Sequence, residues 1–531
     1  MLPKSLSQRF AVGLVPAAFL LILLIAPVGR LLLEGGAGAG AGALAGMIGP
    51  LWQDDYLRWR ITWTFLQAAL TCGLALVLGL PVAWVLARYE FAGRSLVLRL
   101  LMLPFVVPTL VAALGVLALW GPRGLLSGWL GFNLQGTPWL LLYGNLFFNL
   151  CVVVRAGVDA LGQVSASRVA AARTLGATPW RAFWRVEWPA IAPWLASALC
   201  LVFLYCFSGF GLALILGGQR FATVEVEIYT LVAHELKIAE AGALALCMML
   251  LNGGIAWLYA LVEKRLATPS RADAIALRRP LTLRQRSAVV AALLVLLVFC
   301  AAPLLAIVLR TVLAGPAVLA VLLEEETRLA LANTLRFSLS ALALATVLGL
   351  THAVAARHSV GLRASAFLPF VVSPVTVAFG LLLLYPQWTA SLSLLLAAYA
   401  LLAYPFVAKS VGSALDSLPA HLEQAARSLG ASSWRCFWRV TLPLVAPALR
   451  RGMAFAAATS LGEFAVTLFL SRPEWMTLTT LIYQRLGRPG AANLDAALML
   501  ACLLMALSLT AFLLIEKTPG RSTLRKDALH A

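Results

Sequence analysis

Residues 172–193 read ARTLGATPWRAFWRVEWPAIAP, and residues 426–447 read ARSLGASSWRCFWRVTLPLVAP. The two stretches align without a gap at an offset of 254, and 14 of the 22 positions are identical. An internal repeat of this length indicates two copies of one structural unit. Many of the identical positions hold arginine, glycine or an aromatic side chain: Arg173/Arg427, Gly176/Gly430, Trp180/Trp434, Arg181/Arg435, Phe183/Phe437, Trp184/Trp438 and Arg185/Arg439.

Each copy predicts two short helices separated by a glycine. Gly176 and Gly430 stand where a helix ends in the left-handed conformation, which costs glycine little. Thr178–Pro179 predicts an N-cap and a first-turn proline in the first copy, and Ser432 or Ser433 takes the cap in the second. The aromatic residues then follow at i, i+3 and i+4 and form one face, with two arginines beside it. Because a helix this short is not stable alone in water, it is expected to dock on its own bundle or on a partner.

The repeated stretch resembles the EAA loop of the permease subunits of bacterial ABC importers, in which a short coupling helix inserts into a groove on the ATPase. The resemblance is carried in both copies by Ala-Ala-Arg-x-Leu-Gly-Ala, by the helix of aromatic residues and arginines, and by the proline that follows. One position departs from the family. The glutamate before the two alanines is Ala170 in the first copy and Gln424 in the second, with Glu423 one place early, so its role stays open here. Two basic surface helices in a tandem membrane protein are the alternative interpretation.

The resemblance implies that the loops, at about 161–191 and 415–446, couple the permease to two copies of an ATPase subunit. It assigns this coupling role to the positions that match the family's loop. They are Ala172, Arg173, Gly176, Trp180, Arg181, Trp184, Arg185 and Pro189 in the first loop, and Ala426, Arg427, Gly430, Trp434, Arg435, Trp438, Arg439 and Pro443 in the second.

The composition is that of a protein that crosses a membrane many times. Hydrophobic residues make up 62% and charged residues 12% of the 531 residues, and a soluble protein could not bury that much apolar surface. A span needs about 20 apolar residues, and the segment from Phe10 to Leu33 is too long for a signal peptide, so it is expected to stay as the first span. The expected spans form two sets of six, near 10–33, 61–87, 97–120, 138–160, 192–216 and 241–262, and near 287–311, 329–356, 364–386, 392–413, 447–470 and 491–515.

The two sets also match outside the loops, because VLGL occurs at 77–80 and 347–350, and LPFVV at 103–107 and 368–372. The fold expected is an all-α integral membrane protein with about twelve transmembrane helices in two parallel six-helix repeats, which is the type I importer fold that the resemblance implies. Prolines follow both LPFVV segments, and these spans are expected to face the interior of the bundle. The predicted organisation is a first permease half at 1–263, a basic cytoplasmic linker at 264–286, a second permease half at 287–516 and a cytoplasmic tail at 517–531.

The charge distribution predicts the orientation. The net charge is +19, and most of the 41 Lys and Arg fall on the side of the two repeat loops, the linker and both termini. By the positive-inside rule this side is cytoplasmic, which predicts that both termini lie inside. The resemblance to importer permeases implies that the membrane is the bacterial inner membrane. A charge of this size could also suggest nucleic acid as a partner. Its concentration on one membrane face instead favours lipid head groups, against which the linker is expected to lie.

The sequence contains no set of residues typical of catalysis, a cofactor or a metal site. No Gly-Lys dipeptide occurs, so there is no Walker A phosphate loop, and ATP is expected to bind to a separate chain. The five histidines are scattered, and no Cys-x-x-Cys occurs among the eight cysteines. We therefore expect a transport subunit that is not an enzyme and uses no cofactor or metal.

Glu463, inside SLGEF, is the most conspicuous polar residue expected at membrane depth, where a carboxylate is costly. Its counterpart in the repeat is Gly209. Two interpretations stay open: Glu463 has a structural or gating role, or it lines the substrate path, for which Ser208 and Asn149 are further candidates. Interhelical hydrogen bonding is the alternative for Asn149.

The segment LILGGQRFATVEVEIYTLV, at 214–232, is expected to lie outside the membrane after the fifth span. The alternation over Thr223–Tyr229 indicates an amphipathic stretch. It is a candidate docking surface for a periplasmic binding protein, and a segment that rests on lipid is the equal alternative.

Within the importer family, the chain resembles the fused permeases of thiamine importers. The resemblance rests on the twelve-span layout, LWQDDYLRW at 51–59, LGGQRFATVEVEIY at 216–229 and EKTPGR at 516–521. It implies that the chain passes thiamine or thiamine pyrophosphate, a small-molecule substrate delivered by a periplasmic binding protein, to the cytoplasm by alternating access. Fused ferric-iron permeases share the layout and are the alternative within the family. A secondary transporter driven by an ion gradient is the alternative from another class, and it gives the paired loops no role.

Overall fold

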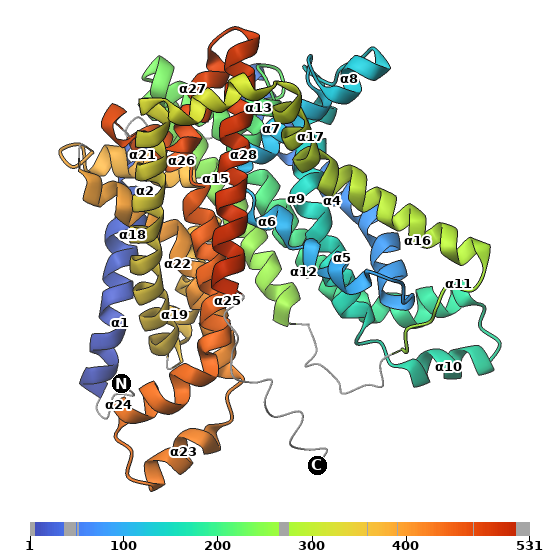
Figure 1. The fold of residues 1–531 in the computed structure, drawn as a ribbon. Coiled ribbons are helices and arrows are strands. Elements are labelled where there is room, and N and C mark those ends of the chain that lie inside the picture. Colours follow the sequence, from blue (N-terminus) through green and yellow to red (C-terminus); the bar gives the residue numbers. More distant parts are fainter. Residues whose placement is uncertain are drawn as a thin grey trace. The chain divides into compact units, whose positions relative to one another are not determined.

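The structure is a computed structural model that describes residues 6–36, 49, 52–264, 275–357, 359–389, 391–470 and 472–516. The tail expected at 517–531, most of EKTPGR and residues 265–274 of the linker lie outside the described residues. Every regular element in the described residues is a helix, and the all-α fold is confirmed (Figure 1).

Two compact units make up the chain. The N-bundle contains Gly35–Phe105 and Thr109–Pro316, and the C-bundle contains Met1–Glu34, Val106–Pro108 and Ala317–Ala531. The first helix of each sequence half therefore belongs to the unit that is built mainly from the other half. A hydropathy pattern marks a span but carries no information on which bundle that span packs against, so the sequence did not predict this exchange. The division into two functional halves at 1–263 and 287–516 stays a prediction.

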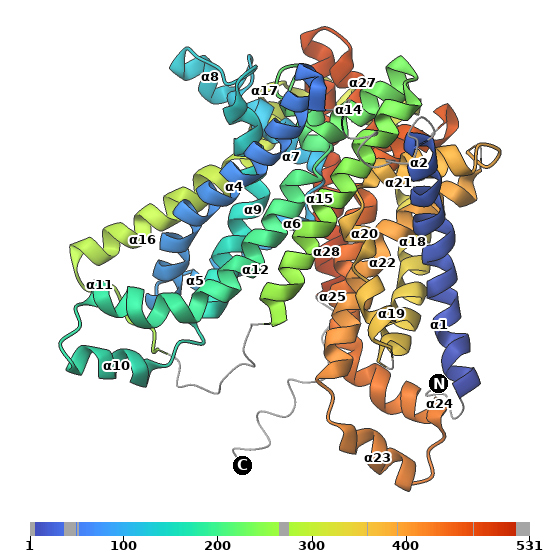
Figure 2. The ribbon, with the colours of Figure 1, turned by 180° about the vertical axis from the view of Figure 1, so that it is seen from behind.

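The N-bundle is built around three long helices and a buried short one. Its elements are α4 (Asp55–Arg88), α5 (Arg94–Leu100), α6 (Leu103–Val106, at the boundary), α7 (Thr109–Trp120), α8 (Leu125–Leu130), α9 (Pro138–Leu161), α10 (Ala166–Thr174), α11 (Pro179–Ala182), η2 (Phe183–Glu187), α12 (Trp188–Phe207), α13 (Gly211–Leu216), α14 (Val224–Thr230), η3 (Leu231–Glu235), α15 (Ile238–Lys264), α16 (Leu283–Leu296), η4 (Leu297–Ala301) and α17 (Ala302–Leu313). Helices α4, α9 and α12 pack on one another, α16 lies along α4, and α17 packs on α7 (Figure 2). Leu110–Leu114 of α7 have no exposed surface, so this helix is part of the core.

The C-bundle repeats this plan. Its elements are α1 (Leu6–Leu20), η1 (Leu21–Ile25), α2 (Ala26–Gly36), η5 (Pro316–Leu323, at the boundary), α18 (Glu325–Ala356), α19 (Val360–Ser365), α20 (Leu368–Val371), α21 (Pro374–Leu384), α22 (Leu392–Asp416), α23 (Ala420–Ser428), α24 (Ser433–Cys436), η6 (Phe437–Thr441), α25 (Leu442–Leu461), α26 (Ala465–Leu470), η7 (Pro473–Trp475), α27 (Leu478–Gly487) and α28 (Ala491–Glu516). Helices α18, α22 and α25 pack on one another, as α4, α9 and α12 do in the N-bundle, and α1 packs on α18. Val377–Phe379 of α21 have no exposed surface, like the core of α7.

The exchanged helices approach their bundles at two glycines. A Cβ atom on Gly115 of α7 would lie 2.6 Å from the carbonyl oxygen of Pro303 in α17. A Cβ atom on Gly380 of α21 would lie 2.9 Å from the carbonyl oxygen of Pro27 in α2. Only glycine permits two backbones to come this close. Each unit therefore has the same kind of contact, a glycine of a buried helix against a proline of the exchanged helix.

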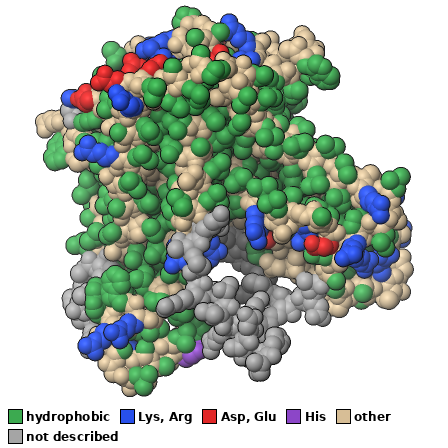
Figure 3. Space-filling model, in the orientation of Figure 1, with side chains coloured by type: hydrophobic (Ala, Val, Ile, Leu, Met, Phe, Trp, Pro, Cys, Tyr) green, Lys and Arg blue, Asp and Glu red, His purple; other side chains and the backbone are tan. Residues whose placement is uncertain are grey.

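Ten helices in the described residues are long and apolar enough to span a membrane, or eleven if the bent pair α19–α20 and α21 counts as one span. The sequence predicts about twelve, and the difference lies at 447–470. There α25 carries Arg450 and Arg451 and is not among the apolar helices, although its counterpart α12 is. Hydrophobic side chains cover the flanks of the helices, and Lys and Arg gather nearer to their ends (Figure 3). The chain is a multi-pass membrane protein.

Prolines divide some of the expected spans. Helix α7 starts just after Pro108 and α21 starts at Pro374, where the helix pair is bent by 96°. Both helices are buried, whereas α5 contains no buried residue, so an interior location is confirmed for α7 and α21 but not for the first parts of these spans. The expected span 192–216 is also divided, at Ser208–Phe210, because α12 ends there and α13 begins.

The described part of the linker is attached to the N-bundle. The N–H of Arg278 donates to the carbonyl of Arg88 at 3.0 Å, and the N–H of Glu90 donates to the carbonyl of Arg278 at 2.9 Å. These two bonds form a short parallel bridge at the end of α4. The linker therefore has a backbone contact with the protein, which its basic composition alone did not predict.

Candidate functional site

Both repeat loops place a glycine between two helices, as the sequence predicts. Helix α10 ends before Gly176 and α23 ends before Gly430, and these glycines have φ angles of 82° and 83°. A side chain at such a φ is strained, so both positions require glycine or a residue such as asparagine that tolerates the left-handed region. The two loops thus turn in the same way.

The helix after each glycine starts at a hydroxyl cap. Thr178 Oγ1 accepts a hydrogen bond from the N–H of Arg181 at 3.3 Å. Ser432 Oγ accepts one from the N–H of Arg435 at 3.3 Å, so Ser432 rather than Ser433 is the cap in the second loop. The N-caps predicted from the sequence are confirmed.

The helices after these caps are not short, which corrects the expectation from the sequence. In the first loop α11, the π-helical turn η2 and α12 follow one another without a break, from Pro179 to Phe207. In the second loop α24, η6 and α25 do the same from Ser433 to Leu461. Each aromatic turn is therefore the first part of a long helix that continues into its bundle, and its stability does not depend on a partner.

One pair of exposed leucines was not among the predicted site residues. Leu175 and Leu429 are each 88% exposed, the highest value among the large hydrophobic side chains in the described residues. Each stands directly before the left-handed glycine of its loop. The repetition of Leu-Gly was visible in the sequence, but the direction in which the leucine points could not be read from it.

Tryptophans extend this apolar surface in both loops. Trp180 is 69% and Trp434 is 54% exposed. The ring centroids of Trp180 and Trp184 lie 5.5 Å apart, and those of Trp434 and Trp438 lie 5.3 Å apart, with similar edge-to-face angles. We call Leu175, Trp180 and Trp184 with the neighbouring arginines the first loop surface, and Leu429, Trp434 and Trp438 with theirs the second loop surface.

The remaining predicted coupling residues lie on or beside these surfaces. Their exposure agrees between the loops at each position. In both loops the alanine is half-buried and the arginines and the proline are exposed. These residues are Ala172, Arg173, Arg181, Arg185 and Pro189 in the first loop, and Ala426, Arg427, Arg435, Arg439 and Pro443 in the second. In the part of the chain that the structure describes, none of these six arginines forms an ion pair with a carboxylate. Each loop surface therefore exposes apolar and basic side chains together.

The candidates for a substrate path have partners within the protein. Asn149 is buried in α9 and donates from Nδ2 to the carbonyl of Asn145 at 2.8 Å and to Sγ of Cys206 in α12 at 3.2 Å, which agrees with the interhelical alternative. Ser208 Oγ accepts from Asn252 Nδ2 at 3.0 Å. Glu463 belongs to the C-bundle and the other two to the N-bundle, so a path that includes all three stays a prediction. The described residues hold no group of three or more His, Cys, Asp or Glu suited to a metal ion.

Glu463 stabilises the local backbone of the C-bundle. It is buried between α25 and α26, and its Oε1 accepts a hydrogen bond from the N–H of Val466, at the start of α26, at 2.9 Å. Its carbonyl oxygen accepts a hydrogen bond from Oγ1 of Thr479 at 2.9 Å. These contacts are those of a structural residue and favour the first of the two interpretations, a structural or gating role, while the substrate-path role of Glu463 stays a prediction.

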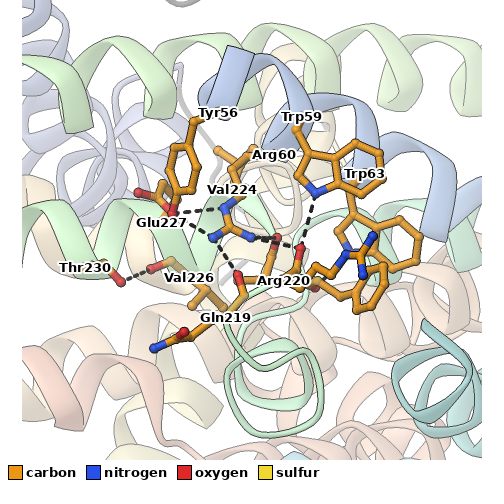
Figure 4. A network of polar contacts seen from close by, with 12 residues as sticks. Tyr56, Trp59, Arg60, Trp63, Gln219, Arg220, Val224, Val226, Glu227 and Thr230 are labelled. Atoms are coloured by element: carbon orange, nitrogen blue, oxygen red, sulfur yellow. Dashed lines mark hydrogen bonds and ion pairs between the residues drawn. The ribbon is translucent and has the colours of Figure 1, made fainter. Parts of the chain in front are cut away.

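A buried arginine holds the segment that was expected to lie outside. Arg60 of α4 donates from Nη2 to the carbonyl of Gln219 at 2.7 Å and to Oη of Tyr56 at 2.6 Å (Figure 4). Its Nε lies 3.2 Å from Oε2 of Glu227, and Tyr56 Oη donates to the same oxygen at 2.8 Å. The network ties the turn at 219–222 and α14 to the first turns of α4.

Both interpretations of Thr223–Tyr229 were therefore wrong. Val224, Glu225 and Ile228 have no exposed surface, so α14 is neither a docking surface nor a segment on lipid. Arg60 provides the buried counter-ion that allows Glu227 to enter the core, and it lies too far along the chain for a local pattern to reveal it. Only Gly218–Arg220, at the turn before α14, is exposed.

Comparison with known proteins agrees with this architecture. The sequence profile of the family described as binding-protein-dependent transport system inner membrane component matches residues 75–268 and 359–516, once in each half. The chain is similar to the thiamine transport system permease protein ThiP of Escherichia coli strain K12, with 29% identity over 495 residues that cover 89% of this chain and 91% of that protein. It is 29% identical to the ThiP protein of Salmonella typhimurium strain LT2, over 90% of this chain and 92% of that protein, and 28% identical to that of Haemophilus influenzae, over 95% of each.

Each family match includes one of the two repeat loops, and together the matches cover more than half of the chain. The chain therefore belongs to the family of binding-protein-dependent transport system inner membrane components, the permeases of bacterial ABC importers, in the fused form that carries both halves in one polypeptide.

Proposed function

We propose that the chain is the permease of an ATP-driven importer that carries thiamine or thiamine pyrophosphate from the periplasm to the cytoplasm. The observation that carries the proposal is the pair of loop surfaces, which agree in exposure position by position. Two matching surfaces call for two copies of one partner, and in this family that partner is an ATPase subunit.

The chemistry of the loop surfaces suits a docking site. Tryptophan and arginine are enriched among the residues that contribute most to protein–protein binding, and both loops expose them together. Leu175 and Leu429 add an apolar side chain that water does not favour. The exposed arginines of both loops favour a partner whose groove carries acidic residues. The long helices α12 and α25 continue from these surfaces into their bundles, so movement of a docked partner has a direct route to the spans.

The substrate is proposed from similarity. The three ThiP proteins are named as thiamine transport system permeases, and each matches most of this chain, including both halves. A periplasmic binding protein is proposed as the second partner, because the family is described as binding-protein-dependent. The buried helix α14 does not provide the contact for this partner.

Affinity capture tests the ATPase partner. The unaltered chain, purified in mild detergent from its native membrane, is expected to retain ATPase subunits. Leu175→Asp combined with Leu429→Asp places two charges in the proposed contacts, so the retained ATPase should fall at least about tenfold, or about 1.4 kcal/mol of binding free energy. The matched control is Leu323→Asp. Leu323 is 77% exposed and lies just before the start of α18, whereas the second repeat loop contacts the other end of that helix at Arg357. This variant should retain the ATPase. Full retention by the double variant would contradict the docking role.

Growth tests the substrate. In a strain that cannot make thiamine, deletion of this gene should abolish growth on low external thiamine and leave ferric-iron uptake unchanged. Normal growth with loss of iron uptake would favour the ferric-iron alternative.

A further inference from the structure

Each repeat loop is joined to a long helix of its own bundle, α4 or α18, by an ion pair of low exposure. In the N-bundle, Nη2 of Arg88, the last residue of α4, lies 2.7 Å from Oε2 of Glu187. The exposed fractions of the two side chains are 11% and 9%. In the C-bundle, Nη1 of Arg357, just after α18, lies 2.9 Å from Oε1 of Glu423, with exposed fractions of 20% and 16%.

The two pairs reach the same arrangement from different sequence positions. Glu187 is the last residue of the π-helical turn η2, and its counterpart in the second loop is Thr441, the last residue of η6. Glu423 instead lies in α23, whose counterpart position in α10 is Val169. Thr441 Oγ1 donates a hydrogen bond to Oε1 of Glu423 at 3.2 Å. The carboxylate of Glu423 therefore lies beside the position that Glu187 holds in the first loop.

The ion pair is thus present in both bundles although its carboxylate stands at different positions of the repeat. The first loop has a carboxylate at 187 and the second has one at 423, yet in both loops a carboxylate in or next to the π-helical turn binds an arginine at the end of the long helix. The same contact is therefore made in both bundles by carboxylates at different positions of the repeat. Removing either partner would leave a poorly solvated charge without compensation, so the pairs resist separation of the loop from the long helix.

We propose that Arg88–Glu187 and Arg357–Glu423 are positioning pairs that make the loops and the long helices α4 and α18 move together, so that closure of the ATPase is transmitted to the spans. This inference rests on the proposed function above, because it assumes that the loop surfaces hold the ATPase. The pairs themselves are set back from the loop surfaces and have little exposed area. They are therefore expected to transmit movement rather than to bind the ATPase.

The test uses the complex of the full chain with its ATPase and its binding protein in proteoliposomes. Glu187→Gln and Glu423→Gln remove the charge and keep the shape, and they are combined in one variant. The combined variant should still retain the ATPase and hydrolyse ATP, but thiamine transported per ATP should fall at least about tenfold, or about 1.4 kcal/mol in coupling. Asp159→Asn, in the exposed pair Arg155–Asp159 of α9 with exposed fractions of 44% and 50%, is the matched control and should leave this ratio unchanged.

Charge exchange distinguishes a direct role of the pair from a general loss of structure. Arg88→Glu should lower transport per ATP, and adding Glu187→Arg should restore most of it. A combined Gln variant that keeps the wild-type ratio would overturn the inference while leaving the proposed function intact. Loss of ATPase retention in that variant would also overturn it, because the pairs would then shape the docking surface. An unaltered chain that captures no ATPase would overturn the proposed function itself, and the inference with it.

Discussion

The hydroxyl oxygen of Thr64 in α4 accepts a hydrogen bond from the backbone N–H of Val224, the first residue of α14, at 2.9 Å. Thr334 in α18 accepts the same bond from Leu478, the first residue of α27, at 2.9 Å. Both threonines also donate to the carbonyl four residues earlier in their own helix. A single buried hydroxyl in each bundle thus ties the start of a short helix to the long one.

Removing these hydroxyls should destabilise each bundle. Thr64→Val and Thr334→Val keep the side-chain volume but leave a buried N–H without a partner, which costs about 1–3 kcal/mol each. We expect a lower apparent melting temperature in detergent for both variants. Thr346→Val is the control, because among the described residues Thr346 bonds only to the carbonyl of Leu342 in its own helix, and it should change the melting temperature little.

The left-handed glycines should be required for the direction of the loop surfaces. Valine at Gly176 and Gly430 would be forced to a φ near 82°, where the left-handed conformation costs roughly 1–2 kcal/mol per residue. The double valine variant should insert into the membrane but lose ATPase retention and thiamine uptake. Asparagine at both positions tolerates this φ and should preserve both activities. Wild-type retention and uptake in the double valine variant would reject the docking assignment.

Topology can be checked by labelling. Trp180→Cys and Trp434→Cys, made one at a time in a chain whose eight native cysteines are replaced, place thiols at exposed positions of the two loop surfaces. In intact spheroplasts an impermeant thiol reagent should leave both unlabelled, and permeabilised cells should be labelled at both. Leu323→Cys, near the opposite end of α18, should be labelled without permeabilisation. Labelling of only one loop from outside would contradict the parallel arrangement of the repeats.

Glu463 should behave as a structural residue. Glu463→Ala removes the acceptor for the N–H of Val466 and should lower the apparent melting temperature together with assembly and transport. Glu463→Gln keeps an acceptor oxygen and should lose less stability. A Gln variant with wild-type stability and basal ATPase activity that no longer transports thiamine would instead place Glu463 in the substrate path.

The repeated loops could be predicted from the sequence because their local chemistry is strong. Glycine before a hydroxyl cap defines a turn with few alternatives, and Gly176 and Gly430 adopt the expected φ. The repeated VLGL also has a physical reason. A Cβ on Gly79 would lie 3.1 Å from Val153 Cγ1, and one on Gly349 would lie 2.6 Å from Val407 Cβ, so each glycine lets its long helix approach its neighbour.

Contacts between distant parts of the chain could not be predicted. The exchanged helix α17 approaches α7 closely where Pro303 meets Gly115, and neither residue is unusual in an apolar span. Glu227 of α14 is buried against Arg60. In the sequence Arg60 resembles an ordinary arginine at the membrane interface, because its partner Glu227 lies far along the chain. The ion pair of Glu423 with Arg357 could not be predicted for the same reason. The sequence shows only that Glu423 stands one position before the family's usual glutamate.

The energy source of transport tests the central claim most directly. Proteoliposomes that contain the chain with its ATPase subunits are supplied outside with thiamine-loaded binding protein, and uptake of labelled thiamine is measured with ATP inside or with a proton or sodium gradient alone. A permease of an ATP-driven importer predicts uptake with ATP and none with the gradients. Uptake driven by a gradient in the absence of ATP, with no increase when ATP is added, would contradict the account.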